Sequence, residues 1–88
     1  MSYHLEFSKQ ANIDIDFHKK SGNKVVLKKL LALLLEISEH PFEGTGKPEP
    51  LKYELAGYWY RRINQQHRLV YEIHDDSIFI HSVLGHYE

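Results

Sequence analysis

The chain has 88 residues, of which 42% are hydrophobic, and this size and composition suit one small folded domain spanning residues 1–88. It contains no cysteine, which excludes a disulfide framework and a zinc–thiolate site. Its net charge of −1 argues against a protein whose whole surface is basic and attracts nucleic acid.

The sequence contains no segment that indicates export or membrane insertion. Residues 1–7 lack a basic stretch followed by an apolar run, so we expect no signal peptide. The most apolar stretch, residues 25–37, is too short and too charged to span a bilayer. We therefore expect a cytoplasmic protein with no membrane partner, and the absence of cysteine suits that reducing compartment.

The first 20 residues predict a strand followed by a helix. Residues 3–7 alternate and contain two aromatic side chains, which is typical of a strand. Alternation of apolar residues over 13–17 would suit a second strand. We favour a helix over 9–20, because Ser8 offers an N-cap and the polar residues 21–23 offer a stop.

A second helix is predicted over residues 24–38, with Asn23 as its cap. Its polar stripe is narrow, so a sheet, another helix or a partner must bury the rest of its surface. Because an 88-residue core is small, we expect Leu30, Leu34 and Ile37 to remain partly available to a partner. The apolar positions are Val26, Leu27, Leu30, Leu31, Leu33, Leu34, Leu35 and Ile37.

Residues 40–50 contain two glycines and three prolines, which predicts that this segment is irregular. Pro48 and Pro50 flank Glu49 and restrict the backbone, so Glu49 is expected in a stiff, extended segment. A stiff loop that presents one carboxylate suits catalysis. A solvated glutamate in a rigid turn is the commoner alternative.

The second half of the chain predicts three strands, over residues 58–64, 67–74 and 77–84, joined by short polar connections. Consecutive strands with short connections form a meander of hairpins. The fold class is therefore α+β, with two N-terminal helices packed on one face of an antiparallel sheet.

Metal-free cleavage of RNA requires a base for the 2′-hydroxyl, a cation for the phosphorane and an acid for the leaving 5′-oxygen. Glutamate or histidine can act as base, arginine as phosphate clamp and histidine as acid. Side chains of these kinds gather in the second half of the chain: Glu49, Lys52, Arg61, Arg62, His67, Arg68, His86 and Tyr87. With Lys47 they also concentrate positive charge there, although a solvated face with ordinary salt bridges would look similar.

Other functions for these residue types are less favoured. The seven histidines show no HExxH spacing and no convergent carboxylates, so neither a metal nor another cofactor is expected. We expect His67 and His74 to be ordinary surface residues of strands. The aromatic residues 58–60 could stack on bases, but packing against neighbouring strands is the commoner role.

Several motifs in this order resemble one known family. They are FEGTGKPEPLK at 42–52, LAGYWYRRI at 55–63, HRLVY at 67–71, DDS at 75–77 and HY at 86–87. They resemble the YoeB-type toxins of the RelE superfamily, found in toxin–antitoxin systems of the YefM–YoeB and Axe–Txe type. The likeness is dense over residues 41–87, whereas the first 40 residues match only in their helical pattern.

This resemblance implies a RelE-like fold and a ribosome-dependent endoribonuclease that cuts mRNA in the ribosomal A site and inhibits translation. Cleavage would be metal-independent and leave a 2′,3′-cyclic phosphate. The implied partners are a YefM-like antitoxin, the ribosome with its mRNA, operator DNA only through the antitoxin complex, and a second copy of the chain in a homodimer.

The resemblance also implies roles for single residues. Glu49 matches the general base, Arg68 the phosphate-stabilising arginine, His86 the general acid and Tyr87 a tyrosine that shapes the site. The expected substrate-binding residues are Lys47, Lys52, Arg61 and Arg62, where Lys52 and Arg62 match basic family positions and Lys47 matches less closely.

The end of the chain departs from the family, whose familiar members end in Arg-Tyr-His-Tyr. Here the residues before His86 are Leu84 and Gly85, so the arginine and its positive charge are missing. Glu88 follows Tyr87 and adds a carboxylate. Two other functions are compatible with the likeness: a silent co-repressor that only binds antitoxin and DNA, or a ribosome-blocking factor that does not cut. Retention of Glu49, Arg68, His86 and Tyr87 together favours the nuclease.

Overall fold

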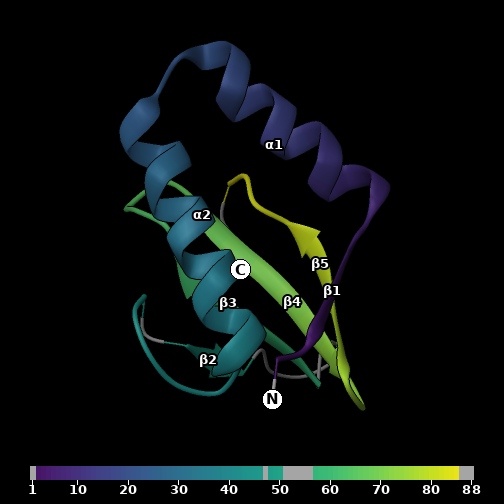
Figure 1. The fold of residues 1–88 in the computed structure, drawn as a ribbon. Coiled ribbons are helices and arrows are strands. Elements are labelled where there is room, and N and C mark those ends of the chain that lie inside the picture. Colours follow the sequence, from purple (N-terminus) through teal and green to yellow (C-terminus); the bar gives the residue numbers. More distant parts are fainter. Residues whose placement is uncertain (1, 47, 51–56, 86–88) are drawn as a thin grey trace.

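The structure is a computed structural model that describes residues 2–46, 48–50 and 57–85, and it contains two helices on one face of a sheet (Figure 1). The expected α+β class is confirmed. In chain order the elements are β1 (His4–Phe7), α1 (Lys9–Ser21), α2 (Lys24–Glu39), β2 (Glu49–Pro50), β3 (Tyr58–Arg62), β4 (Arg68–His74) and β5 (Ser77–Ser82).

Both helices begin at the predicted caps. The Ser8 hydroxyl accepts a hydrogen bond from the Ala11 N–H at 2.9 Å, and the Asn23 side chain accepts one from Val26 at 3.1 Å. Gly22 ends α1 in the left-handed conformation at φ 72°, which glycine adopts without strain. The preference for a helix over a second strand in residues 9–20 is therefore confirmed.

Over the described residues, the sheet has five strands in the order β1-β5-β4-β3-β2. Strands β3, β4 and β5 form the predicted meander of antiparallel hairpins. The expectation of a purely antiparallel sheet is wrong at one edge, because β1 pairs with β5 in parallel. Two helices and the rest of the sheet separate these strands in sequence, so no tight turn forces them to run in opposite directions.

Residues 40–50 are not wholly irregular, because Glu49–Pro50 forms the short edge strand β2. Glu49 lies opposite Tyr60, and Pro50 lies opposite Trp59. A proline is tolerated here because one side of an edge strand has no neighbouring strand, so the missing N–H of proline removes no hydrogen bond from the sheet. The predicted extended conformation of Glu49 is confirmed, and β3 provides the surface that holds it.

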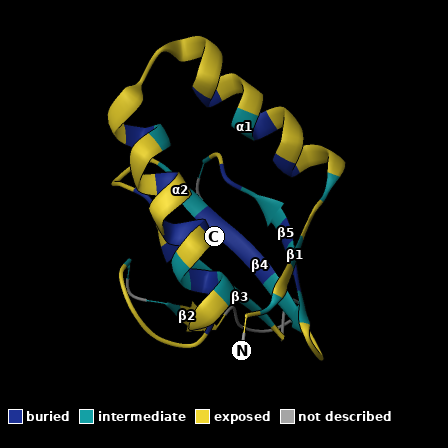
Figure 2. Cartoon of the chain, in the orientation of Figure 1, coloured by how far each residue is buried: buried dark blue, intermediate teal, exposed yellow. Residues whose placement is uncertain are grey.

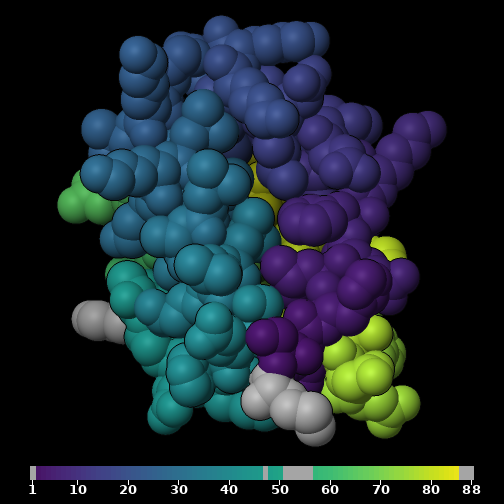
Figure 3. Space-filling view, in the orientation of Figure 1, coloured from purple at the N-terminus to yellow at the C-terminus, as the bar shows by residue number. Residues whose placement is uncertain are grey.

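The hydrophobic core lies between the two helices and the sheet (Figure 2). In the space-filling view the helices, β1 and the loop after α2 cover most of this face of the sheet (Figure 3). Leu30, Leu34 and Ile37 are 1%, 8% and 0% exposed, so the expectation that they remain available to a partner is wrong. Leu31 and Leu35 are instead exposed, at 65% and 66%, because the helix turns that side away from the sheet.

The buried side of α1 includes two polar side chains that fasten the end of β5. Asp14 accepts a hydrogen bond from the Val83 N–H at 3.0 Å, and His18 Nε2 lies 2.8 Å from the Val83 carbonyl. Both side chains are 2% exposed, and these contacts satisfy backbone groups where the β-ladder ends. Among the residues described, neither helix is long and apolar enough to cross a membrane.

Two neighbouring leucines test which side of α2 is buried against the sheet. We expect Leu30→Ala to lower the free energy of unfolding by about 2–5 kcal/mol, because it leaves a cavity under the helix. The exposed Leu31→Ala should change it by less than about 0.5 kcal/mol. Urea unfolding of both variants measures the difference, and equal losses would contradict the burial pattern.

Candidate functional site

The sheet has a second face, away from the helices, which we call the open face. Arg61 of β3 is fully buried on the helix side, so its neighbours Tyr60 and Arg62 point to the other side. Directly paired residues share a face, and Glu49 is paired with Tyr60 while Arg68 is paired with Arg62. The open face therefore carries Glu49, Tyr60, Arg62 and Arg68.

Tyr60 links the two residues expected to carry the chemistry. Its hydroxyl donates a hydrogen bond to Glu49 Oε2 at 2.8 Å. The Arg68 guanidinium carbon lies 4.6 Å from the centre of the Tyr60 ring, which is cation–π geometry. The predicted base and the predicted phosphate clamp are thus brought together through a third side chain.

The Glu49 carboxylate changes the ionisation of this tyrosine. The hydrogen bond to Glu49, with burial and the Glu49 charge, raises the pKa of Tyr60, and Arg68 and Arg62 oppose this with smaller effects. Tyr60 therefore stays protonated near neutral pH and acts as a donor toward Glu49.

The end of the described chain lies beside Arg68. The Gly85 N–H donates to His67 Nδ1 at 3.0 Å, and the Gly85 carbonyl accepts from the Arg68 N–H at 2.9 Å. The His67 ring also contacts His18 edge-on, with 4.9 Å between ring centres. His67 is thus half-buried and precedes β4, unlike the exposed strand residue that we expected, whereas His74 is exposed in β4 as predicted. His86, Tyr87, Lys47 and Lys52 lie outside the described residues.

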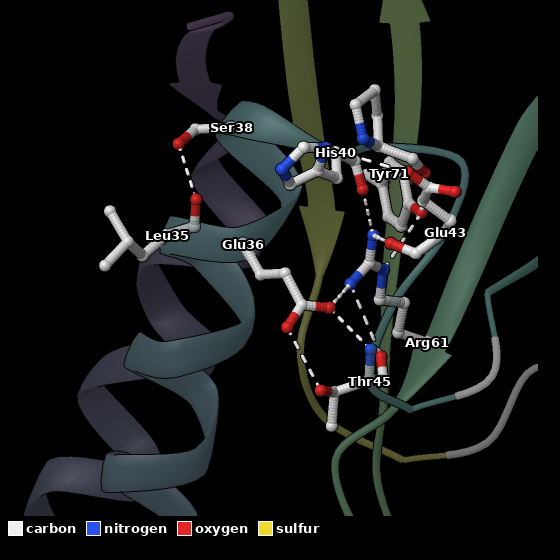
Figure 4. A network of polar contacts seen from close by, with 9 residues as sticks. Leu35, Glu36, Ser38, His40, Glu43, Thr45, Arg61 and Tyr71 are labelled. Carbon is white, nitrogen blue, oxygen red and sulfur yellow. Dashed lines mark hydrogen bonds and ion pairs between the residues drawn. The ribbon is translucent and has the colours of Figure 1, made fainter.

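Arg61 does not lie on the open face, which corrects its assignment to substrate binding. It is 0% exposed, and its guanidinium points toward the end of α2 and the following loop (Figure 4). The phase of β3 turns every second side chain inward, so Arg61 and Arg62 have different surroundings. The Arg61 N–H groups donate to the Glu36 carboxylate, the Tyr71 hydroxyl and the carbonyls of His40, Glu43 and Thr45.

This arginine network fixes the loop that leads to Glu49. Gly44 has φ 120°, and a Cβ there would overlap the Glu36 carboxylate. Gly46 has φ 84°, and a Cβ there would lie 2.8 Å from the Arg62 carbonyl oxygen. The Gly46 carbonyl accepts the Arg62 N–H at 2.9 Å, which ties the loop to β3. Two glycines and one buried cation therefore set the path along which the chain reaches β2.

A second polar cluster lies farther along the open face. Glu72 contacts His74 Nε2 at 2.8 Å and His81 Nε2 at 3.0 Å, and His81 stacks on Tyr58 with ring centres 4.5 Å apart. Burial would raise the pKa of Glu72, but the His81 hydrogen bond and the histidine charges outweigh it and lower the pKa. Within the described part of the chain, no group of three or more acidic or histidine side chains is placed to hold a metal ion.

Two helices on one face of a mixed sheet form the fold of the RelE-like toxins. The family profile described as the YoeB-like toxin of bacterial type II toxin-antitoxin system matches residues 7–87. The chain belongs to this family of YoeB-like toxins.

Individual relatives agree with the profile. Toxin YoeB of Escherichia coli (strain K12) is 49% identical over 65 residues, which are 74% of this chain and 77% of that protein. The YoeB dimer from Staphylococcus aureus superposes with a TM-score of 0.87 at 42% identity, over 99% of this chain and 100% of that chain. The YoeB-YefM complex from Staphylococcus aureus gives a TM-score of 0.84 at 43% identity, with the same coverage.

The Arg61 network predicts an acid dependence of stability. Burial raises the pKa of Glu36, but hydrogen bonds from Thr45 and Arg61 and the Arg61 charge outweigh it, so the folded-state pKa is lowered. A lowered pKa means that the ionised carboxylate stabilises the fold at pH values above the pKa of glutamate in the unfolded chain, about 4.3. This contribution is lost as the pH falls through the pKa of Glu36 in the folded protein. We expect Glu36→Gln to be less stable than the wild type at about pH 6 and the gap to narrow at about pH 3.

Urea unfolding at the two pH values measures this gap. Glu39→Gln is the matched control, because Glu39 lies exposed on the same helix and should leave stability nearly unchanged at both. A Glu36→Gln gap that is independent of pH would show that the ion pair does not contribute to stability.

Proposed function

We propose that this toxin is a ribosome-dependent endoribonuclease that cleaves mRNA in the ribosomal A site and so inhibits translation. The observation that supports it best is the meeting of Glu49 and Arg68 through Tyr60 on the open face. This arrangement supplies a carboxylate base and a phosphate-binding cation at one place, as metal-free RNA cleavage requires.

In the proposed reaction, Glu49 removes the proton of the 2′-hydroxyl. The 2′-oxygen then attacks the adjacent phosphorus, and the bond from phosphorus to the 5′-oxygen breaks. Arg68 stabilises the negative charge of the phosphorane, and His86 donates the proton that the leaving 5′-oxygen takes. The products are a 2′,3′-cyclic phosphate and a 5′-hydroxyl, and Tyr87 shapes the site around them. No metal ion takes part.

Substrate binding is assigned to basic side chains around this pair. Arg62 is exposed and paired with Arg68, so it can contact the RNA backbone beside the scissile phosphate. Lys47 and Lys52 are proposed to bind the same backbone on the strength of their sequence positions. Arg61 is left out of this role, because its N–H groups are used inside the protein.

The partners follow from relatives of the chain. Because a YoeB-YefM complex and a YoeB dimer exist in Staphylococcus aureus, we propose a YefM-like antitoxin and a homodimer here. Exposed Leu31 and Leu35 on α2 offer the antitoxin apolar surface. Operator DNA would be bound only through the antitoxin complex, in the cytoplasm where the ribosomes are.

The test is to map mRNA ends in a purified translation system. We expect new 3′ ends at A-site codons, and cleavage that is orders of magnitude faster on translating ribosomes than on naked mRNA. A net charge of −1 provides little general attraction for RNA, whereas a ribosome can align the codon. Stalling without new ends would indicate a ribosome blocker, and the absence of any effect would indicate a silent co-repressor. Equal cleavage rates on naked and ribosome-bound mRNA would show that the site is complete without the ribosome.

Arg68 should be essential for cleavage but not for folding. Loss of one preorganised group that stabilises the transition state typically costs about 100- to 1000-fold in rate, and we expect this for Arg68→Ala. Lys20→Ala is the charge-matched control, since Lys20 pairs with Asp16 on the exposed side of α1. Near wild-type cleavage by a folded Arg68→Ala protein would remove Arg68 from the mechanism.

A further inference from the structure

We propose that Tyr60 is a positioning residue for cleavage, which holds the Glu49 carboxylate and the Arg68 guanidinium in fixed places on the open face before RNA binds. The proposal rests on the proposed function. The expectation from the sequence was different, because it treated the aromatic residues 58–60 as packing groups or possible base-stacking groups.

Glu49 needs such support because of where it lies. Among the described residues, strand β2 comprises Glu49 and Pro50, which are both exposed, and it pairs with β3 at the edge of the sheet. A glutamate side chain has several rotatable bonds, so an exposed one samples many orientations. The hydrogen bond from the Tyr60 hydroxyl to Oε2 restrains Glu49 and leaves Oε1 to receive the proton of the 2′-hydroxyl.

Arg68 needs support for an electrostatic reason. It is directly opposite Arg62 in the β3–β4 ladder, and like charges in that position repel. The face of the Tyr60 ring attracts the guanidinium, whose central carbon lies 4.6 Å from the ring centre, and this attraction offsets part of the repulsion. A planar guanidinium matches the geometry of two phosphate oxygens, so holding it in one place favours phosphate binding there.

One rigid side chain therefore serves both groups. A tyrosine ring is fixed by two torsion angles, so restraining it costs little conformational entropy compared with a longer polar chain. Its hydroxyl remains protonated because the nearby Glu49 carboxylate raises the pKa of Tyr60. Tyr60 thus acts as a hydrogen-bond donor to Glu49, and we expect its effect on the cleavage rate to pass through Glu49 and Arg68.

The two contacts can be removed separately and followed by single-turnover cleavage of ribosome-bound mRNA. Tyr60→Phe keeps the ring under Arg68 and loses the hydroxyl. We expect it to lower the maximal rate about 10-fold while the half-saturating toxin concentration stays within about twofold, because a misplaced base slows chemistry more than binding. Tyr60→Leu loses both contacts, so we expect it to lower the maximal rate about 100-fold. Tyr58→Phe is the matched control on the same strand and face, with a rate within about twofold of wild type.

A double-mutant cycle distinguishes positioning from general structural support. If Tyr60 acts through Glu49, then Tyr60→Phe should cause almost no further loss in a Glu49→Gln protein. Independent, multiplying losses would overturn the inference. In the free protein, Glu49→Gln should also lower the pKa of Tyr60, because the negative charge is removed and the amide oxygen accepts a weaker hydrogen bond than the carboxylate. NMR of ¹³C-labelled tyrosine measures this pKa.

The outcomes separate this inference from the proposed function. If the wild-type protein cleaves mRNA and Tyr60→Phe cleaves it at the same rate, the inference is overturned and the proposed function stands. The same holds if Glu49→Gln leaves the pKa of Tyr60 unchanged. Absence of cleavage by the wild-type protein would overturn the proposed function and the inference with it.

Discussion

The buried guanidinium of Arg61 is the interaction on which the site depends. A charge without solvent is costly unless hydrogen bonds and an opposite charge compensate it, and here the Glu36 carboxylate, the Tyr71 hydroxyl and three backbone carbonyls do so. These partners come from α2, β4 and the loop after α2. The arginine therefore joins the helix layer to the sheet and determines where the loop leaves α2. Since this loop leads into β2, the Arg61 guanidinium that is buried in the interior also fixes the segment that brings Glu49 to the open face.

The side chains of strand β3 point alternately to the helix side and to the open face of the sheet. Arg61 points inward and fixes the loop, whereas Tyr60 and Arg62 on either side of it point to the open face. On the proposed function, these three consecutive residues have three different roles. A charge count along the sequence treats Arg61 and Arg62 as equivalent, and only the phase of the strand distinguishes them. That phase is set by the burial of Ile63 and by the pairing of β3 with β4.

Much of the fold could be predicted because the signals are local. Ser8, Asn23 and Gly22 define the helix ends through contacts within four residues, and the short polar connections define the hairpins. The parallel pairing of β1, the strand at Glu49 and the buried side of α2 depend on contacts between distant segments, so sequence patterns did not determine them. The same holds for the site. Family motifs select Glu49 and Arg68 as candidate catalytic residues, but the contact of Tyr60 with both requires the register of three strands.

The division of labour in the proposed reaction follows from these constraints. In the part of the chain that the structure describes, buried polar interactions fix one loop and the end of β5, and Glu49 and Arg62 lie exposed on the open face. Electrostatic preorganisation and substrate alignment are separate contributions to rate. On the proposed function, Glu49, Tyr60 and Arg68 provide the first in the free protein, and the ribosome provides the second. A small toxin can therefore be specific for translated mRNA without carrying a large RNA-binding surface of its own.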